Sequence, residues 1–194
     1  MKKRVLVIIV IFAGFIKPIY TQNEPKQAIN ICAIAIPVMD IYVVNYEYLY
    51  HSRHGLAVRV EYAPRLKGAN TNGVMWAGVL DYRWHLSPVM NGFFAGPYLR
   101  YRYSSGSGKT RLNNYKYNVP ELNLGLNAGF RWISKLGINV VIAAGYGYSI
   151  IKENLTPSNS DIEFTFTKFK NDNVTNTSLF DAPFYGEVSI GYAF

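Results

Sequence analysis

The sequence lacks several features that characterise common classes of small protein. Among its 194 residues there is a single cysteine, Cys32, so an intramolecular disulfide is excluded. The three histidines are His51, His54 and His85, and the sequence offers no convergent third ligand with which they could hold a metal. The one continuous apolar run, residues 5–16, is too short to cross a bilayer of ~30 Å as a helix. These absences exclude a disulfide-stabilised domain and argue against a helical membrane span.

The apolar run follows Lys2-Lys3-Arg4, and this order is typical of a secretory signal. We expect residues 1–21 to be a signal peptide cleaved near Thr21/Gln22, and residues 22–194 to form a single domain; an uncleaved anchor is the alternative. The segment 1–21 carries four basic residues, so its removal would lower the formal net charge from +8 by four units. No basic stripe with interleaved aromatic residues follows, so we expect no nucleic-acid partner.

Beyond residue 22 the sequence has no helical periodicity, and apolar and polar residues alternate instead. Residues two apart share one face of a strand, so each alternating segment predicts a strand with one apolar face. The expected strands are residues 29–36, 41–50, 56–64, 74–84, 93–103, 121–132, 138–148 and 184–194. An even number of such segments favours an all-β fold, an eight-stranded antiparallel up-and-down transmembrane β-barrel.

Four of the strands end on an aromatic-x-aromatic step that places two rings on the apolar face. These rings are expected to form an interfacial girdle, and they belong to Tyr48, Tyr50, Tyr82, Trp84, Phe130, Trp132, Tyr192 and Phe194. Short turns at 51–54, 85–91 and 133–135 alternate with longer loops at 65–73, 104–119 and 151–181. Bacterial barrels have short turns in the periplasm. We therefore expect the girdle and both termini on the periplasmic side of the outer membrane of a Gram-negative bacterium.

The two possible folds differ in which face of the strands points inward. In a membrane barrel the polar face points inward, whereas in a soluble barrel or sandwich the apolar face would do so. An eight-stranded barrel has an interior just wide enough for side chains. The polar face is rich in small residues and the apolar face in rings, which favours lipid outside. The inward face then carries five acids and five arginines, namely Glu47, Glu61, Asp81, Glu121, Glu187, Arg59, Arg83, Arg100, Arg102 and Arg131. Arginine pairs bidentately with carboxylates in confined space, so this lumen charge network predicts a plug; an ion or proton path is the alternative.

The signal, the eight alternating strands and the ending Glu187-Val188-Ser189-Ile190-Gly191-Tyr192-Ala193-Phe194 resemble small outer-membrane barrels of the OmpA/OmpX fold. The internal motifs Val44-Asn45-Tyr46-Glu47-Tyr48 and Gly92-Phe93-Phe94-Ala95-Gly96-Pro97-Tyr98-Leu99-Arg100-Tyr101 resemble a family of small barrels of unassigned function. The resemblance implies a fold and no activity. It also implies two partners, the outer-membrane lipid and the barrel-assembly machinery, for which the terminal phenylalanine resembles a recognition signal.

We expect a non-enzymatic protein that acts structurally, through its outer loops, or as an accessory subunit of an envelope complex. A protein partner would bind the loop 151–181, in which residues 162–167 alternate and could form an exposed strand; a merely solvated loop is the alternative. An outer-membrane lipid-modifying enzyme is one alternative, although all three histidines fall at periplasmic turns, away from the outer leaflet. A narrow channel is the other alternative. No catalytic, cofactor-binding or metal-binding residue is expected.

Overall fold

The structure is a computed structural model, and it describes residues 25–32, 35, 40–68, 71–109, 114–151, 154–157 and 184–194. The expected signal peptide, the strand-like segment 162–167 and nearly all of the loop 151–181 lie outside these residues. The strands are β1 (Gln27–Ile31), β2 (Tyr42–His51), β3 (His54–Gly68), β4 (Thr71–His85), β5 (Gly92–Lys109), β6 (Asn114–Ile133), β7 (Ile138–Ile151), β8 (Asn154–Pro157) and β9 (Phe184–Ala193).

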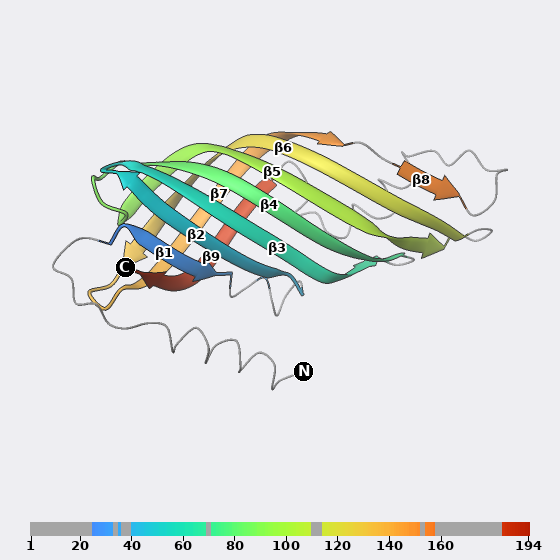
Figure 1. Cartoon of the computed structure of the whole chain (residues 1–194), viewed down its shortest axis with the longest axis horizontal. Helices are drawn as coiled ribbons and strands as arrows, with labels where there is room; N and C mark the ends of the chain where they lie inside the picture. The colour runs from blue at the N-terminus through green and yellow to red at the C-terminus, as the bar shows by residue number, and fades with distance from the viewer. Residues whose placement is uncertain are drawn as a thin grey trace.

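Eight of these strands close into an antiparallel barrel, as the alternation predicts (Figure 1). Each barrel strand pairs with its neighbour in the chain, except that β7 is followed in the sheet by β9. The closing contact joins the first strand to the last, with Ile29 opposite Tyr192. The expected all-β, eight-stranded antiparallel fold is therefore confirmed. β8 is an additional short strand that pairs with the edge of β6.

Two of the expected loops are strands in the structure. β3 and β4 stay paired as far as Gly68 and Thr71, and β5 and β6 as far as Lys109 and Asn114, so the predictions of loops at 65–73 and 104–119 are wrong. Backbone pairing does not need apolar side chains, and these polar, glycine-rich residues pair because each strand continues a ladder that the barrel has already begun. Together with β8 they form a sheet that projects past the other strands (Figure 1), and we call it the extension: residues 63–68, 71–75, 104–109, 114–119 and β8.

Gly73 and Gly106 are required in the extension because a ring lies over them. A Cβ atom at either position would collide with the phenol of Tyr117, which is buried against the same face of the sheet. The first strand also departs from expectation. It spans Gln27–Ile31 and so begins two residues before the expected range 29–36, of which residues 33, 34 and 36 lie outside the described residues.

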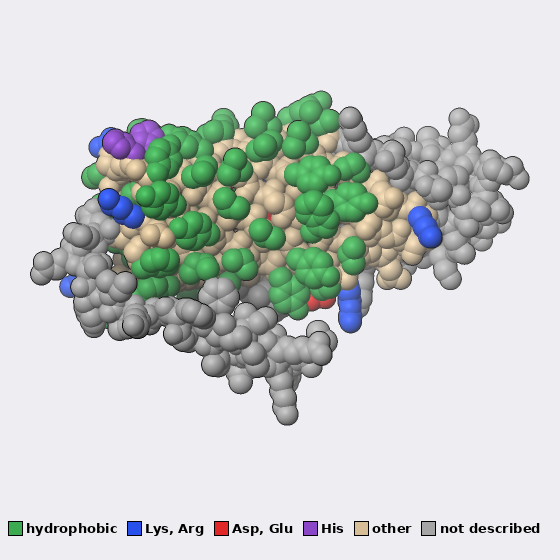
Figure 2. Space-filling model, in the orientation of Figure 1, with side chains coloured by type: hydrophobic (Ala, Val, Ile, Leu, Met, Phe, Trp, Pro, Cys, Tyr) green, Lys and Arg blue, Asp and Glu red, His purple; other side chains and the backbone are tan. Residues whose placement is uncertain are grey.

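Side-chain burial follows the period of two throughout the barrel. The outward positions are apolar, as at Leu124 and Leu126 of β6, which are 61% and 68% exposed, whereas inward polar groups such as Asn123 and Asn127 are buried. Figure 2 shows apolar side chains spread over the visible wall, with lysine, arginine and histidine gathered toward its two ends. None of the described residues forms a helix long and apolar enough to span a membrane. The polar face is the interior, and the alternative in which the apolar face points inward is wrong for this barrel.

Aromatic rings gather at two levels of the outer wall. The eight predicted girdle residues lie at the same end of the barrel, because β2, β4, β6 and β9 run in the same direction and each carries its step at its last residues. At the other level, Trp76 contacts Tyr101 and Tyr103, with ring centroids 5.5 and 5.9 Å apart. We call the predicted girdle the first band. The second band comprises Tyr62, Trp76, Tyr101, Tyr103, Tyr146 and Tyr148.

Candidate functional site

The charged lumen is the densest cluster of polar chemistry in the described part of the chain. The ten charged residues expected on the inward face all lie there, because each occupies the inward parity of its strand; nine are buried and Arg102 is partly buried. They divide into two groups along the barrel. The Arg83 cluster lies toward the first band and contains Glu47, Asp81, Arg83, Arg131 and Glu187. The Arg100 cluster lies toward the second band and contains Arg59, Glu61, Arg100, Arg102 and Glu121.

Arg83 is the centre of the first cluster, and its guanidinium joins three strands. Its Nη1 lies 2.7 Å from Oε2 of Glu47, its Nε 2.8 Å from Oδ2 of Asp81, and its Nη2 2.6 Å from Oε2 of Glu187. All four side chains are at least 99% buried. The planar fork of arginine can hold several carboxylates at once, which a lysine ammonium does not do in the same geometry.

Glu47 receives two further partners, and one of them was not expected from the sequence. Arg131 Nη2 lies 2.5 Å from Oε2 of Glu47, and His85 Nε2 lies 2.9 Å from its Oε1. The interpretation of His85 as a polar turn residue is wrong: it is the last residue of β4 and is fully buried. The signal was present in the sequence, since His85 continues the inward series that begins with Asp81 and Arg83.

Uncharged side chains complete the packing around the Arg83 cluster. The Tyr185 hydroxyl donates to Glu187 at 2.9 Å, and the Asn127 amide donates to Asp81 at 2.7 Å. Arg83 also lies over the ring of Phe94, 4.5 Å from its centroid. This part of the lumen is filled by side chains that bind one another.

The Arg100 cluster is less evenly matched. Arg59 pairs with Glu61 at 2.8 Å, and Arg102 Nε donates to Glu121 at 2.7 Å. Arg100 forms a longer ion pair with the same carboxylate, with its Nη2 3.7 Å from Oε1 of Glu121. Three arginines therefore share two carboxylates in this cluster, whereas the Arg83 cluster has three carboxylates and two arginines.

The remaining histidines lie on the outside of the first band. His54 Nδ1 is 2.6 Å from the hydroxyl of Tyr82, and its ring contacts those of Tyr50 and His51. They extend the aromatic band at the turn between β2 and β3. Within the described ranges, no group of three or more histidine, cysteine or carboxylate side chains is arranged to hold a metal ion.

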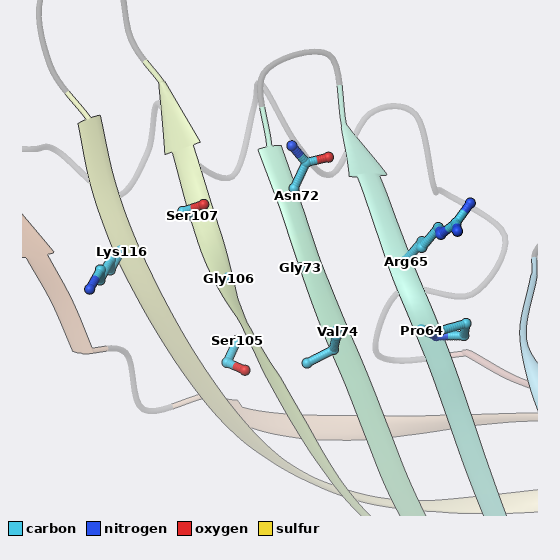
Figure 3. Close-up of a pocket in the computed structure, with 9 residues that line it drawn as sticks. All are labelled: Pro64, Arg65, Asn72, Gly73, Val74, Ser105, Gly106, Ser107 and Lys116. Carbon is cyan, nitrogen blue, oxygen red and sulfur yellow. The ribbon is translucent and has the colours of Figure 1, made fainter.

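A second candidate site is an open hollow of about 710 Å³ on the extension. Figure 3 shows that it crosses four neighbouring strands, with Arg65 on β3 at one margin and Lys116 on β6 at the other. The two cations point away from each other, and Asn72, Ser105 and Ser107 lie between them. The hollow presents a broad polar surface and no converging set of reactive groups.

Comparison with known proteins identifies a family and no function. No curated protein matches the chain. Residues 6–179 match the family described as "Protein of unknown function (DUF3575)", and this match covers most of the sequence. The lumen, the outer wall and the extension described above are thus properties of a small β-barrel whose family carries no assigned activity. The chain belongs to the DUF3575 family.

Proposed function

We propose that this protein is an integral outer-membrane barrel with a plugged lumen, related in fold to the OmpA/OmpX barrels, which acts without catalysis as a structural or surface-interaction protein. The observation that carries the proposal is the inverted arrangement of the barrel, with a continuous apolar wall outside and buried ion pairs inside. An apolar wall of this extent in water would be an aggregation hazard, whereas in lipid it is the surface that the bilayer requires.

The dimensions of the apolar wall support a membrane location. The outward apolar stretch of β6 from Leu122 to Trp132 has eleven residues, and a tilted transmembrane strand needs about 9–11. Aromatic bands flank this stretch at both ends, at the level where Trp and Tyr rings meet lipid head groups. The same argument assigns the first band and both termini to the periplasmic side, because the turns beside that band are short.

The packing of the lumen supports a closed barrel over a channel. The Arg83 cluster spans β2, β4, β6 and β9 with ion pairs of 2.5 to 2.8 Å, so an ion would have to break several of them to pass.

The extension supports the interaction role. It carries a polar sheet beyond the second band, where a partner outside the cell could reach it, and β7 ends and β9 begins toward the same end of the barrel.

The first experiment is electrophoresis of the purified outer-membrane fraction with and without boiling. A folded barrel resists unfolding by the detergent at room temperature, so the unboiled protein is expected to migrate differently from the boiled one. A protein that is recovered in the soluble fraction and migrates identically in both lanes contradicts the proposal. Lipid extracts from cells with and without the protein test the enzymatic alternative, and we expect the same lipid species in both.

A further inference from the structure

Two histidines face each other across the hairpin between β2 and β3. β2 ends at His51 and β3 begins at His54, and the two are paired in register on either side of the turn residues Ser52 and Arg53. Strict alternation would turn His51 to the same side as the buried Leu49, but the register shifts between them and His51 is exposed. As a result the two imidazole rings meet, with their centroids 5.7 Å apart. We call His51 and His54 the histidine pair.

Tyr82, on the neighbouring strand β4, holds the ring of His54 in place. Nδ1 of His54 lies 2.6 Å from the hydroxyl oxygen of Tyr82. When Nδ1–H donates to this oxygen, the lone pair that can bind a metal is on Nε2. Histidines that bind metals usually have such an outer partner, which fixes the tautomer and the orientation of the ring. Among the described residues, no hydrogen bond occupies Nε2 of His54 or either ring nitrogen of His51.

The spacing of the histidine pair suits one metal ion between the two rings. A Zn–N bond is about 2.0–2.1 Å long and an imidazole nitrogen is about 1.2 Å from the centre of its ring, so each centre lies about 3.2 Å from a bound ion. A centroid separation of 5.7 Å then corresponds to an N–metal–N angle of roughly 120°. A tetrahedral site needs about 109°, which a small rotation of the exposed His51 ring can supply.

The chemistry of the ligands indicates which ions the pair would bind. Imidazole nitrogens favour Cu²⁺, Ni²⁺ and Zn²⁺ over Mg²⁺ and Ca²⁺, with Cu²⁺ bound most tightly. No third histidine, cysteine or carboxylate of the described residues joins the pair, so water would fill the remaining positions. The pair is accessible, since Figure 2 shows histidine side chains at the surface near one end of the barrel. The charge of Arg53 in the turn is exposed, so water and salt screen it.

We propose that the histidine pair binds one divalent transition-metal ion, Cu²⁺ in preference to Ni²⁺ and Zn²⁺, through Nε2 of His54 and a ring nitrogen of His51. Water completes the coordination, and Tyr82 is a positioning residue that acts through His54. Binding of the ion does not depend on the proposed function. Under that function the ion would lie at the periplasmic rim of the barrel, because the histidine pair adjoins the first band.

The test uses tryptophan fluorescence, since Trp84 is opposite His54 in the register of β3 and β4 and bound Cu²⁺ quenches indole emission. The full-length protein without an affinity tag is kept in non-ionic detergent at neutral pH. It is titrated with CuCl₂ alone and then in the presence of ZnCl₂ or MgCl₂. We expect quenching that saturates at one Cu²⁺ per chain and is reversed by EDTA. Zn²⁺ should raise the Cu²⁺ concentration needed for half-maximal quenching, and Mg²⁺ should leave it unchanged.

Electron paramagnetic resonance of the bound Cu²⁺ gives a second measurement that needs no variant. Two imidazoles on one ion produce the hyperfine pattern of two nitrogen ligands, and we expect this pattern in the unaltered protein. A pattern of a single nitrogen would show that the two histidines do not share an ion, and it would overturn the proposal.

Variants locate the ion. His51→Gln and His54→Gln are each expected to raise the Cu²⁺ concentration for half-maximal quenching roughly a hundredfold or more, because each removes one of two ligands. Tyr82→Phe keeps the ring and removes the hydroxyl, and we expect an increase of roughly tenfold with the two-nitrogen pattern retained. Tyr192→Phe is the matched control. It removes a hydroxyl from the same band on β9, which pairs with neither β2 nor β3, and should leave binding unchanged.

The outcomes separate the metal site from the proposed function. Each variant is first shown to keep the heat-dependent mobility of the unaltered protein. If the folded protein binds no Cu²⁺, or if binding survives unchanged in both histidine variants, the metal site is overturned while the barrel stands. If the unaltered protein shows no heat-dependent mobility, the proposed membrane function fails, and the same titration still decides whether the histidine pair binds the ion.

Discussion

At the residue scale, the lumen depends on charges that share partners. Arg83 holds carboxylates from β2, β4 and β9, and Glu47 in turn holds Arg83, Arg131 and His85. Taking these charges out of water is expensive, and the pairs offset that cost only while every partner is present. Loss of one shared residue therefore leaves several groups without compensation, and the barrel should be more sensitive to such a loss than to the loss of an exposed charge.

We expect Arg83→Met to lower the free energy of unfolding by about 3–5 kcal/mol or more, because three buried carboxylates would lose a partner while the volume is nearly kept. The measurement is urea unfolding of the protein in detergent micelles, followed by tryptophan fluorescence. Arg53→Met, at an exposed turn position, is the control and should change the free energy by less than about 0.5 kcal/mol. Equal unfolding midpoints for the two variants would contradict the central role of Arg83.

The sequence predicts which residues face the lumen but not which residues pair. Inward facing follows from the period of two, which is a local property of each strand. Pairing across the lumen depends on the stagger of distant strands. Arg83 meets Glu187 across 104 positions of sequence, and no local pattern encodes that distance. His85 was missed because a turn was expected to begin at the residue where β4 ends.

At the scale of the element, composition was a poor guide to where strands end. Residues 104–109 are mostly serine and glycine, which suggests a flexible loop, yet they pair with β4 on one side and β6 on the other. An existing antiparallel ladder lowers the free-energy cost of adding the next backbone pair. A sequence pattern that considers only side chains does not include this effect. β1 likewise begins at Gln27, two residues before the start that its apolar alternation predicts.

The extension should be separable from the barrel because its contribution to the packed lumen is small. Ser104 and Val119 are in register, so the β5–β6 part of the extension, residues 105–118, can be replaced by an Asn-Gly turn that joins the two strands without changing the ladder below. We expect this variant to insert into the membrane and to keep its heat-dependent mobility, with the loss of any partner that binds the polar sheet. The measurement is the gel-mobility assay combined with crosslinking on intact cells.

The same deletion shows whether the extension is an independent interaction surface or a part of the fold that stabilises the barrel. A shortened protein that fails to fold would show that the extension stabilises the barrel and would remove it as an independent interaction surface. A matched control is the double substitution Ser105→Ala and Ser107→Ala, which keeps both strands but removes two hydroxyls from the hollow in Figure 3. We expect that control to fold normally and to weaken partner crosslinking only if the hollow takes part in binding.

At the scale of the whole molecule, the distribution of side chains is the one that the proposed membrane location requires. Between the two aromatic bands every outward side chain is uncharged, while the charged residues are in the lumen or toward the ends. In the proposed location, lipid would cover the apolar outer wall, while the ion pairs satisfy the charged groups inside the lumen.

Leu126→Arg tests this arrangement directly, because Leu126 is 68% exposed at the middle of the outward stretch of β6. In water, an exposed leucine can be replaced by arginine at almost no cost, within about 0.5 kcal/mol. At the midplane of a bilayer the same change costs about 2–4 kcal/mol. We expect the free energy of folding into phospholipid vesicles to be weakened by that larger amount, as measured by urea titration of the folded fraction.

Ser107→Arg, exposed on β5 beyond the second band, is the matched control and should change the folding free energy by only about 0–1 kcal/mol, the cost near the membrane interface. Equal and small effects at both positions would mean that no bilayer surrounds residue 126, and the apolar wall would then have to be covered by protein.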